Sequence, residues 1–418
     1  MRVLRSILVP VMCVICCASS LDAAVDPIVQ LAKLTASDGG SDDDFGYSIA
    51  ISGNVVAVGG INNEVSVFVK PAGGWQNMTQ TAILTPSTKV NGFGRAVAIS
   101  GNVIIVGAPL ANQDQGAAYA FLKPATGWHD MTETAMLVPS DGAPGDRFGN
   151  SVSVSGDTAI VGADEATVGG NLFEGAAYIF TPQASAQDSA NPHAMTLTET
   201  AKLTASDAVA GSTFGSAVSI AGKVVAVGAQ GGNAGAGEAY VFVKPQSGWT
   251  SMTQTAVLNP SDSGGNLGTA IATNGATVVA GAPLAASQGM GKGAIYVFVE
   301  PSDGWADITE TAKLQSSALG PIGNSVVVDV TGHYVAAGAP QGAGNGNSSG
   351  QVSIFAKPAD GWQNTSQANW EVFSSSGLRG DLLGSSISFS DKALVTGAPG
   401  AKVGNHISQG EAFVFGRN

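Results

Sequence analysis

The sequence predicts an all-β fold, a seven-bladed β-propeller built of four-stranded antiparallel blades. Three observations lead to this prediction. One motif recurs seven times, the segments between its copies have the pattern of short strands and tight turns, and no helical period appears after the N-terminal segment. Because a single repeat cannot bury its own faces, each unit must pack against its neighbours, and a radial arrangement of four-stranded units is a propeller.

The clearest copy of the motif runs from Phe93 to Pro109 and reads FGRAVAISGNVIIVGAP. A Phe-Gly pair opens it, a Gly turn divides two apolar runs, and Gly-Ala-Pro closes it. We expect the Phe to fill the space between neighbouring blades, and the Gly after it to occupy a site without room for a side chain or with a positive φ angle. The other copies open at Phe45, Phe148, Phe214, Leu267, Ile322 and Leu383.

This copy shows the expected order of strands. Ala96–Ser100 alternates with period two, as a half-buried strand does, and Gly101-Asn102 predicts a tight hairpin turn. Val103–Val106 is a continuous apolar run, typical of a strand covered on both faces. A variable loop, a third strand over Ala117–Leu122 and a fourth around Thr134–Leu137 complete the unit. We interpret the Met-Thr-Glu-Thr segment before the fourth strand as an ordinary connection that leads into an edge strand.

The two ends of the chain predict how the ring closes. The last unit supplies three strands and then stops, whereas Val29–Thr35 (VQLAKLT) matches the fourth-strand text TAKLT at 200–204. We therefore expect this first strand to complete the last blade and remove the open sheet edges. The third unit is the longest, and its insertion Gln183–Ala194 predicts an exposed loop.

Residues 1–24 are interpreted as a secretory signal peptide, and residues 25–418 as one propeller domain. Arg2 and Arg5 precede an apolar core over Ile7–Ala18 that is too short to span a bilayer. A short uncleaved anchor is the alternative. A lipoprotein signal is disfavoured because no small residue precedes Cys16 or Cys17. We expect a secreted, extracellular or cell-surface protein, or a periplasmic one if the source is bacterial.

Cysteine usage and charge limit the chemistry and the partners. The three cysteines all lie within residues 1–24, so the mature chain has no disulfide and no thiol chemistry. The net charge of −13, without a basic stripe, disfavours nucleic acid and anionic membranes. We expect a monomer without a stable membrane span.

The motif resembles the FG-GAP repeat of integrin α-subunit propellers, and the resemblance covers roughly Val29 to Phe415. It implies a seven-bladed ring that is usually extracellular and serves binding or adhesion. Integrin-type repeats often carry an Asp-x-Asp-x-Asp-Gly calcium loop between the first and second strands. The corresponding turns here, such as Ser52-Gly53-Asn54 and Ala221-Gly222-Lys223, offer too few carboxylates. No cofactor is therefore expected, and calcium is not carried over.

Three conspicuous features have a structural interpretation as well as a functional one. The acidic run Asp42, Asp43 and Asp44 is a weak candidate for a cation site or an Asx-capped turn. Arg379-Gly380-Asp381 spells the integrin-recognition tripeptide, but Gly145-Asp146 occupies the same repeat register, which favours a structural origin. Five Gly-Trp turns could stack sugars or pack an outer hairpin, and packing is favoured; they hold Trp75, Trp128, Trp249, Trp305 and Trp362.

The loops after the second strands are the best binding candidates, because they vary while the frame does not. We expect them to share one face with the loops that precede each opening residue, and to bind a protein or a glycan; plain flexible loops are the alternative. The candidate ligand-binding residues are Asn112, Gln113, Asp114, Asp164, Glu165, Asn171, Asn233, Gln288, Asn345 and Asn405.

Signals for catalysis are weak. The four histidines show no metal-ligand spacing, and no nucleophile elbow or zinc-protease motif is present. The preferred hypothesis is a secreted binding propeller. An extracellular hydrolase or lyase acting on polysaccharide, built on the same ring, is the second, and a structural matrix component is the third. A Ser/His/Asp triad assembled across blades would leave no motif in the sequence. Sequons at Asn77, Asn347 and Asn364 matter only in a eukaryotic source.

Overall fold

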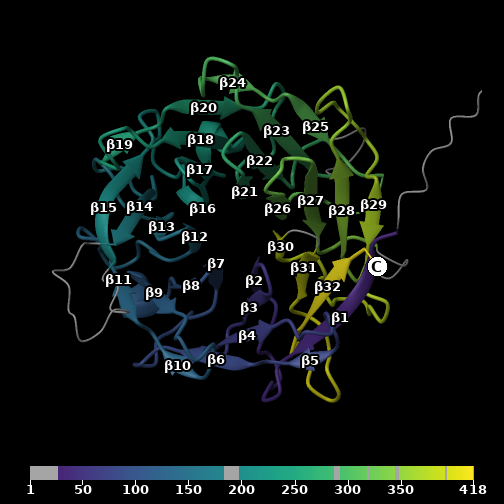
Figure 1. Ribbon diagram of the computed structural model, residues 1–418. Coiled ribbons are helices and arrows are strands. Elements are labelled where there is room, and N and C mark those ends of the chain that lie inside the picture. The colour runs from purple at the N-terminus through teal and green to yellow at the C-terminus, as the bar shows by residue number, and fades with distance from the viewer. Residues whose placement is uncertain are drawn as a thin grey trace, which may run out of the picture.

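The computed structural model describes residues 27–182, 197–286, 292–317, 320–343, 348–390 and 393–417. Seven β-sheets stand around a central axis and form a closed ring (Figure 1). The predicted seven-bladed propeller is therefore confirmed. The predicted signal peptide and the insertion Gln183–Ala194 lie outside the described residues.

Each blade contributes four antiparallel strands, ordered here from the axis outward. Blade 1 contains β2 (Ser48–Ser52), β3 (Val55–Gly59), β4 (Val65–Val69) and β6 (Ala82–Thr85). Blade 2 contains β7 (Ala96–Ser100), β8 (Val103–Ala108), β9 (Ala117–Leu122) and β11 (Ala135–Leu137). Blade 3 contains β12 (Ser151–Ser155), β13 (Thr158–Ala163), β14 (Ala176–Pro182) and β15 (Leu197–Thr204). Blade 4 contains β16 (Phe214–Ala221), β17 (Val224–Ala229), β18 (Glu238–Val243) and β20 (Ala256–Asn259).

The remaining blades follow the same order. Blade 5 contains β21 (Ala270–Thr273), β22 (Thr277–Ala282), β23 (Ala294–Val299) and β25 (Ala312–Leu314). Blade 6 contains β26 (Ser325–Val328), β27 (Tyr334–Ala339), β28 (Gln351–Ala356) and β29 (Trp370–Val372). Blade 7 contains β30 (Ile387–Ser390), β31 (Ala393–Ala398), β32 (Glu411–Gly416) and β1 (Val29–Thr35).

The N-terminal strand closes the ring, as predicted. Strand β1 pairs antiparallel with β32, from Val29 opposite Gly416 to Leu34 opposite Ala412. Purple β1 therefore lies beside yellow β32 in Figure 1. The side chains of Ala32 and Leu34 are buried in the core shared by blades 7 and 1. Closure thus joins the two ends of the chain through both hydrogen bonds and apolar packing.

The glycines of the motif set the distance between blades. Gly149, which follows the opening Phe148, has a φ angle of +93°. Its carbonyl oxygen faces Gly107 of the preceding blade so closely that a Cβ atom on Gly107 would overlap it. The same backbone contact recurs around the whole ring, between Gly59 and Gly94, Gly162 and Gly215, Gly228 and Gly268, Gly281 and Gly323, Gly338 and Gly384, and Gly397 and Gly46.

The opening aromatic residue fills the interior between neighbouring blades. Phe148 is fully buried and belongs to a cluster that includes residues of blades 2 and 3. Its ring meets those of Tyr178 and Phe180 edge-on, with centroid distances of 5.6 and 5.8 Å, which is a favourable aromatic geometry. Leucine or isoleucine takes this buried position in blades 5 to 7, at Leu267, Ile322 and Leu383.

The Met-Thr segment before the fourth strand does more than lead into that strand, which is the role predicted from the sequence, because it also pairs with the neighbouring blade. Three Met-Thr segments and the equivalent Ile-Thr segment of blade 5 each form a two-residue strand that pairs parallel with the outer strand of the preceding blade. These short strands are β5 (Met78–Thr79), β10 (Met131–Thr132), β19 (Met252–Thr253) and β24 (Ile308–Thr309). Four of the seven sheets therefore have five strands, because the neighbouring blade supplies the last one.

Polar side chains reinforce this outer belt. The carboxylate of Glu133 accepts a hydrogen bond from the backbone N–H of Ser87 in the preceding blade at 2.7 Å, and Asp130 accepts one from Ile83 at 2.8 Å. A Gln or Glu crosses each of the seven junctions to a Ser, and the other pairs are Gln30–Ser375, Gln80–Ser37, Glu199–Ser140, Gln254–Ser206, Glu310–Ser261 and Glu371–Ser316.

Helical structure is confined, in the described part of the chain, to two four-residue turns. They are α1 (Ala111–Asp114) and α2 (Gly232–Gly235), and both contain residues with left-handed φ angles. No described helix has the length and apolarity needed to cross a membrane.

Removing β1 tests the closure of the ring. We expect a chain that begins at residue 36 to lose at least about 5 kcal/mol of stability, because two buried side chains and the pairing with β32 disappear. Differential scanning calorimetry would then show a much lower Tm or no cooperative transition. A chain that begins at residue 27 is the control. Equal melting of the two chains would contradict the role assigned to β1.

Candidate functional site

Two sets of loops meet at one end of the ring, as the sequence predicts. The backbone N–H groups of Arg147 and Phe148 in blade 3 donate to the carbonyl oxygens of Asp114 and Gln115 in blade 2, both at 2.9 Å. Backbone hydrogen bonds at five further junctions, such as that from Asp44 to Ser408 at 2.9 Å, follow the same pattern. At six of the seven junctions, the loop after a second strand thus lies against the loop before the next opening residue.

We call this end of the ring the loop face. Its first set of segments follows the second strands and comprises residues 60–64, 109–116, 164–175, 230–237, 283–286, 292–293, 340–343, 348–350 and 399–410. Its second set precedes the opening residues and comprises residues 36–44, 86–92, 138–147, 205–213, 260–266, 315–317, 320–321 and 373–382.

The candidate polar residues are brought to this face but not into one pocket. Asn112, Gln113 and Asp114 are exposed and belong to α1, with φ angles of 52°, 61° and 61°. Asn233 is exposed in the equivalent turn α2 of blade 4. The other exposed candidates lie in blades 3 and 7 and are Asn171 and Asn405. Gln288 and Asn345 lie outside the described residues.

Asp164 is buried, unlike the other polar candidates. It stands where four repeats have the Pro of Gly-Ala-Pro, and its side chain is only 8% exposed. Its Oδ1 atom has no hydrogen-bond partner among the described residues. Burial, with a smaller contribution from the charge of Glu165, raises the pKa of Asp164 to about 6. The neighbouring Glu165 forms an ion pair with Arg147 at 2.9 Å.

The acidic run Asp42–Asp44 forms a turn against blade 7. Asp42 and Asp44 have left-handed φ angles of 62° and 50° and donate backbone hydrogen bonds to Ile407 and Ser408, whereas the Asp43 carboxylate caps the N–H of Gly40. Burial, followed by the charges of Asp42 and Asp43, raises the pKa of Asp44. Within the described residues, no group of three or more His, Cys, Asp or Glu is arranged to hold a metal ion.

The Arg379-Gly380-Asp381 tripeptide has its carboxylate turned into its own loop. Asp381 is 8% exposed, and its Oδ2 accepts a hydrogen bond from the N–H of Leu378 at 2.7 Å. Asp146 caps Ala143 in the same way at 2.8 Å. The shared repeat position therefore accounts for this Asp as a loop cap.

The recurrent tryptophans pack against the blades. Four of them are only 5–7% exposed: Trp128, Trp249, Trp305 and Trp362. Trp75 is half-buried against the core of blades 7 and 1. The rings therefore pack the outer hairpins, as favoured, and the four buried rings have no free face for a sugar.

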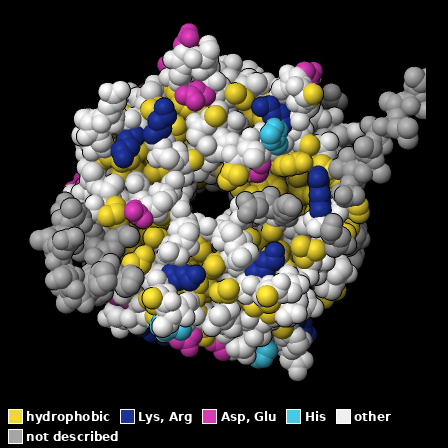
Figure 2. All heavy atoms as spheres, viewed as in Figure 1, with side chains coloured by type: hydrophobic (Ala, Val, Ile, Leu, Met, Phe, Trp, Pro, Cys, Tyr) yellow, Lys and Arg dark blue, Asp and Glu magenta, His cyan; other side chains and the backbone are white. Residues whose placement is uncertain are grey.

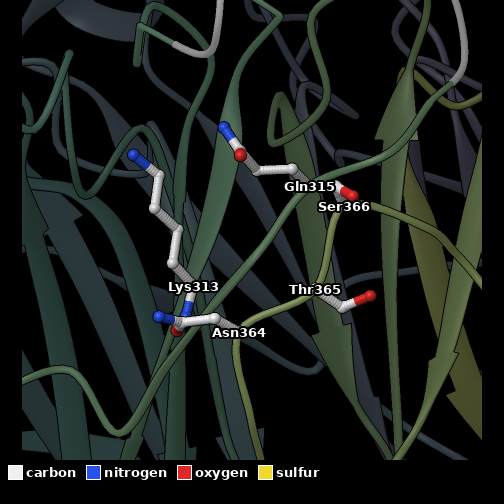
Figure 3. Close-up of a pocket in the computed structure, with 5 residues that line it drawn as sticks. All are labelled: Lys313, Gln315, Asn364, Thr365 and Ser366. Atoms are coloured by element: carbon white, nitrogen blue, oxygen red, sulfur yellow. The ribbon is translucent and has the colours of Figure 1, made fainter.

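Figure 2 shows an opening at the centre of the ring, with Lys and Arg side chains separated from one another around the face in view. Figure 3 shows a shallow polar pocket at the outer belt between blades 5 and 6. There Lys313 N–H donates to Asn364 Oδ1 at 2.7 Å and Gln315 N–H to the carbonyl oxygen of Thr365 at 2.9 Å, so this pocket is part of the belt.

The loop face also carries exposed apolar side chains, whereas all the binding candidates predicted from the sequence are polar. Leu172 and Phe173 in blade 3 are 61% and 49% exposed, and Val209 in the adjoining loop of blade 4 is 58% exposed. Further examples on this face are Leu284, Leu378 and Ile407. The available signal was an apolar residue inside a loop otherwise rich in Gly, Asn and Asp.

The buried carboxyl of Asp164 predicts a specific dependence of stability on pH. Its pKa is higher in the folded state than the 3.8 of an unperturbed Asp, so the folded state favours the protonated form. This stabilisation is complete below about pH 4 and is lost as pH rises through 6. Asp164→Asn should therefore gain stability relative to wild type by up to about 3 kcal/mol between pH 4 and pH 7.5.

Urea unfolding of both proteins across this pH range measures the difference. Asp157→Asn, which alters an exposed carboxylate in the β12–β13 hairpin, is the control and should keep a nearly constant offset. Parallel stability curves for Asp164→Asn and wild type would show that Asp164 is not held in its protonated form.

A comparison with known protein families agrees with the observed fold and with the repeated motif. The family model of the FG-GAP repeat matches residues 28–67, 78–121, 131–180 and 197–242. These segments cover β1 and most of blades 1 to 4. No curated protein matches the chain. Blades 5 and 6 and the strands β30 to β32 of blade 7 lie outside the matched segments but keep the same glycine contacts and the same buried opening position. The chain is an FG-GAP repeat β-propeller.

Proposed function

We propose that this protein is a secreted or cell-surface binding module that holds an extracellular protein or carbohydrate on its loop face. The observation that carries the proposal is the hydrogen bonding of the two variable loop sets into one face. Their backbone is fixed by the neighbouring blade, so their exposed side chains stand on a rigid support. Loops on a rigid scaffold are the usual place for recognition.

The exposed side chains suit polar recognition. Asn112, Gln113, Asn233 and Asn405 each present a carbonyl oxygen and an NH₂ group. Asn171 presents its carbonyl oxygen, and its NH₂ group donates to Glu174 at 2.8 Å. Such amides can both donate to and accept from a sugar hydroxyl or a peptide backbone. Each contact contributes little alone, and the ring distributes them over several blades, so a ligand would gain affinity by touching more than one loop.

Secretion supports this function. The proposed signal peptide over residues 1–24 directs the chain outside the cell, where an adhesive ring would meet glycans and other proteins. The net charge of −13 keeps such a surface soluble and directs it away from nucleic acid. We propose that the ring acts as a monomer without a calcium cofactor.

Glycan and extracellular-protein arrays probed with the mature chain test the proposal. We expect a ligand to be retained without turnover, and binding to fall about fivefold or more in the double variant Asn112→Ala, Gln113→Ala. The matched control is Asn102→Ala, which alters an exposed Asn at the opposite end of β8 in the same blade. If only the control variant lost binding, recognition would lie away from the loop face. Release of a cleaved product from a glycan would instead favour the hydrolase or lyase.

A further inference from the structure

We propose that Leu172, Phe173 and Val209, which we call the junction patch, anchor a protein partner that presents an apolar side chain beside Lys or Arg. The patch lies on the loop face where blade 3 meets blade 4. The proposal rests on the loop face being the binding surface, and it names the class of partner and the place where it docks.

Backbone hydrogen bonds hold the junction patch together. The N–H groups of Gly211 and Thr213 in blade 4 donate to the carbonyl oxygens of Leu172 and Phe173 in blade 3, both at 3.0 Å. Within the blade 4 loop, Val209 N–H donates to Ser212 Oγ at 2.9 Å, and Ser212 is almost fully buried. The loops of both blades are therefore fixed, and their apolar side chains lie on adjoining segments.

The three side chains expose apolar surface that the fold does not bury. Their exposed fractions of 61%, 49% and 58% are far above those of the residues that pack between blades. Neighbouring exposed apolar residues on a folded protein mark an interaction site more often than isolated ones do. The patch would lose its contact with water only against another molecule.

Phe173 also occupies a backbone position that disfavours it. Its φ angle is +56°. The equivalent residues in blades 2, 6 and 7, which lie two positions before the Gly that directly precedes the third strand, are Asp114, Ser348 and Ser408. Those residues have φ angles of 61°, 49° and 50°. A left-handed conformation is less costly for a short polar side chain than for a bulky one. The Phe therefore opposes the local preference, which points to a role in binding.

The charge around the patch selects a basic partner. The two loops that form it, residues 164–175 and 205–213, contain no Lys or Arg. Among their carboxylates, Asp207 is exposed and Glu165 is partly exposed, whereas Asp164 and Glu174 are buried. Arg147, from the preceding segment of the second loop set, pairs with Glu165. An apolar centre with a polar rim is the usual organisation of a protein interface. Complementarity to this rim requires Lys or Arg around the apolar anchor of the partner.

A protein fits the patch better than a glycan. The side chains of Leu172 and Val209 have no hydrogen-bonding groups, and they contribute only by removing apolar surface from water. A sugar surface is dominated by hydroxyls, which would lose their hydration against these aliphatic groups without recovering hydrogen bonds. An inserted Leu, Ile, Met or aromatic side chain gains from the same contact.

Selection from a random dodecapeptide display library on the mature wild-type chain tests the proposal. We expect enriched peptides to combine a large apolar residue with Lys or Arg, and their binding to weaken with salt. Phe173→Ser should reduce the affinity of synthetic copies by about tenfold or more. Ser is the native residue at this position in blades 6 and 7, so the variant should fold with an unchanged or higher Tm. The control is Leu284→Ser, which alters an exposed apolar residue of the loop face outside the junction patch and should bind as wild type does.

Several results would overturn the proposal, and they separate it from the function of the loop face as a whole. Failure to enrich peptides, enrichment without basic residues, or equal binding by Phe173→Ser would exclude the junction patch as a site for basic apolar partners. If the binding survives Phe173→Ser but is lost in Asn112→Ala, Gln113→Ala, the loop face still binds and only the patch is wrong. Retention of a glycan that depends on Phe173 would replace the protein partner with a carbohydrate.

Discussion

The fold depends on backbone contact between glycines of neighbouring blades. The closing Gly, at or next to the end of the second strand of one blade, faces the carbonyl oxygen of the Gly that follows the opening residue of the next blade. This contact occurs at all seven junctions. A side chain at the closing Gly would push the blades apart and shift every strand that follows. The two ends of the FG-GAP motif are therefore spacers, and the apolar strands between them pack only because the spacing is correct.

The residues that hold the blades together are different from the residues that are available for recognition. The glycine contacts, the buried opening residues and the outer belt hold each blade on its neighbour near the axis, in the interior and at the rim. The loop face is left to vary because its backbone hydrogen bonds do not depend on particular side chains. Residues that oppose the local structural preference, such as buried Asp164 and left-handed Phe173, stand out against this regular frame.

The architecture could be predicted because it is periodic in the sequence. Seven copies of the motif and the spare strand Val29–Thr35 were enough to specify the ring and its closure, and the register of the repeat correctly explained Asp381. Features that depend on neighbours in space were missed. The pairing of Met131–Thr132 with the preceding blade and the burial of Asp164 have no local signature, and the conformation of Phe173 emerges only by comparing equivalent loops.

The most direct test of the frame compares the stabilities of two glycine variants in urea. Gly107→Ala places a Cβ atom against the carbonyl oxygen of Gly149, whereas Gly73→Ala adds one in open space at an ordinary φ angle. We predict that Gly107→Ala costs several kcal/mol, roughly 3 or more, or prevents folding, and that Gly73→Ala changes stability by less than about 1 kcal/mol. Equal, small effects of the two substitutions would contradict the spacer role of the motif.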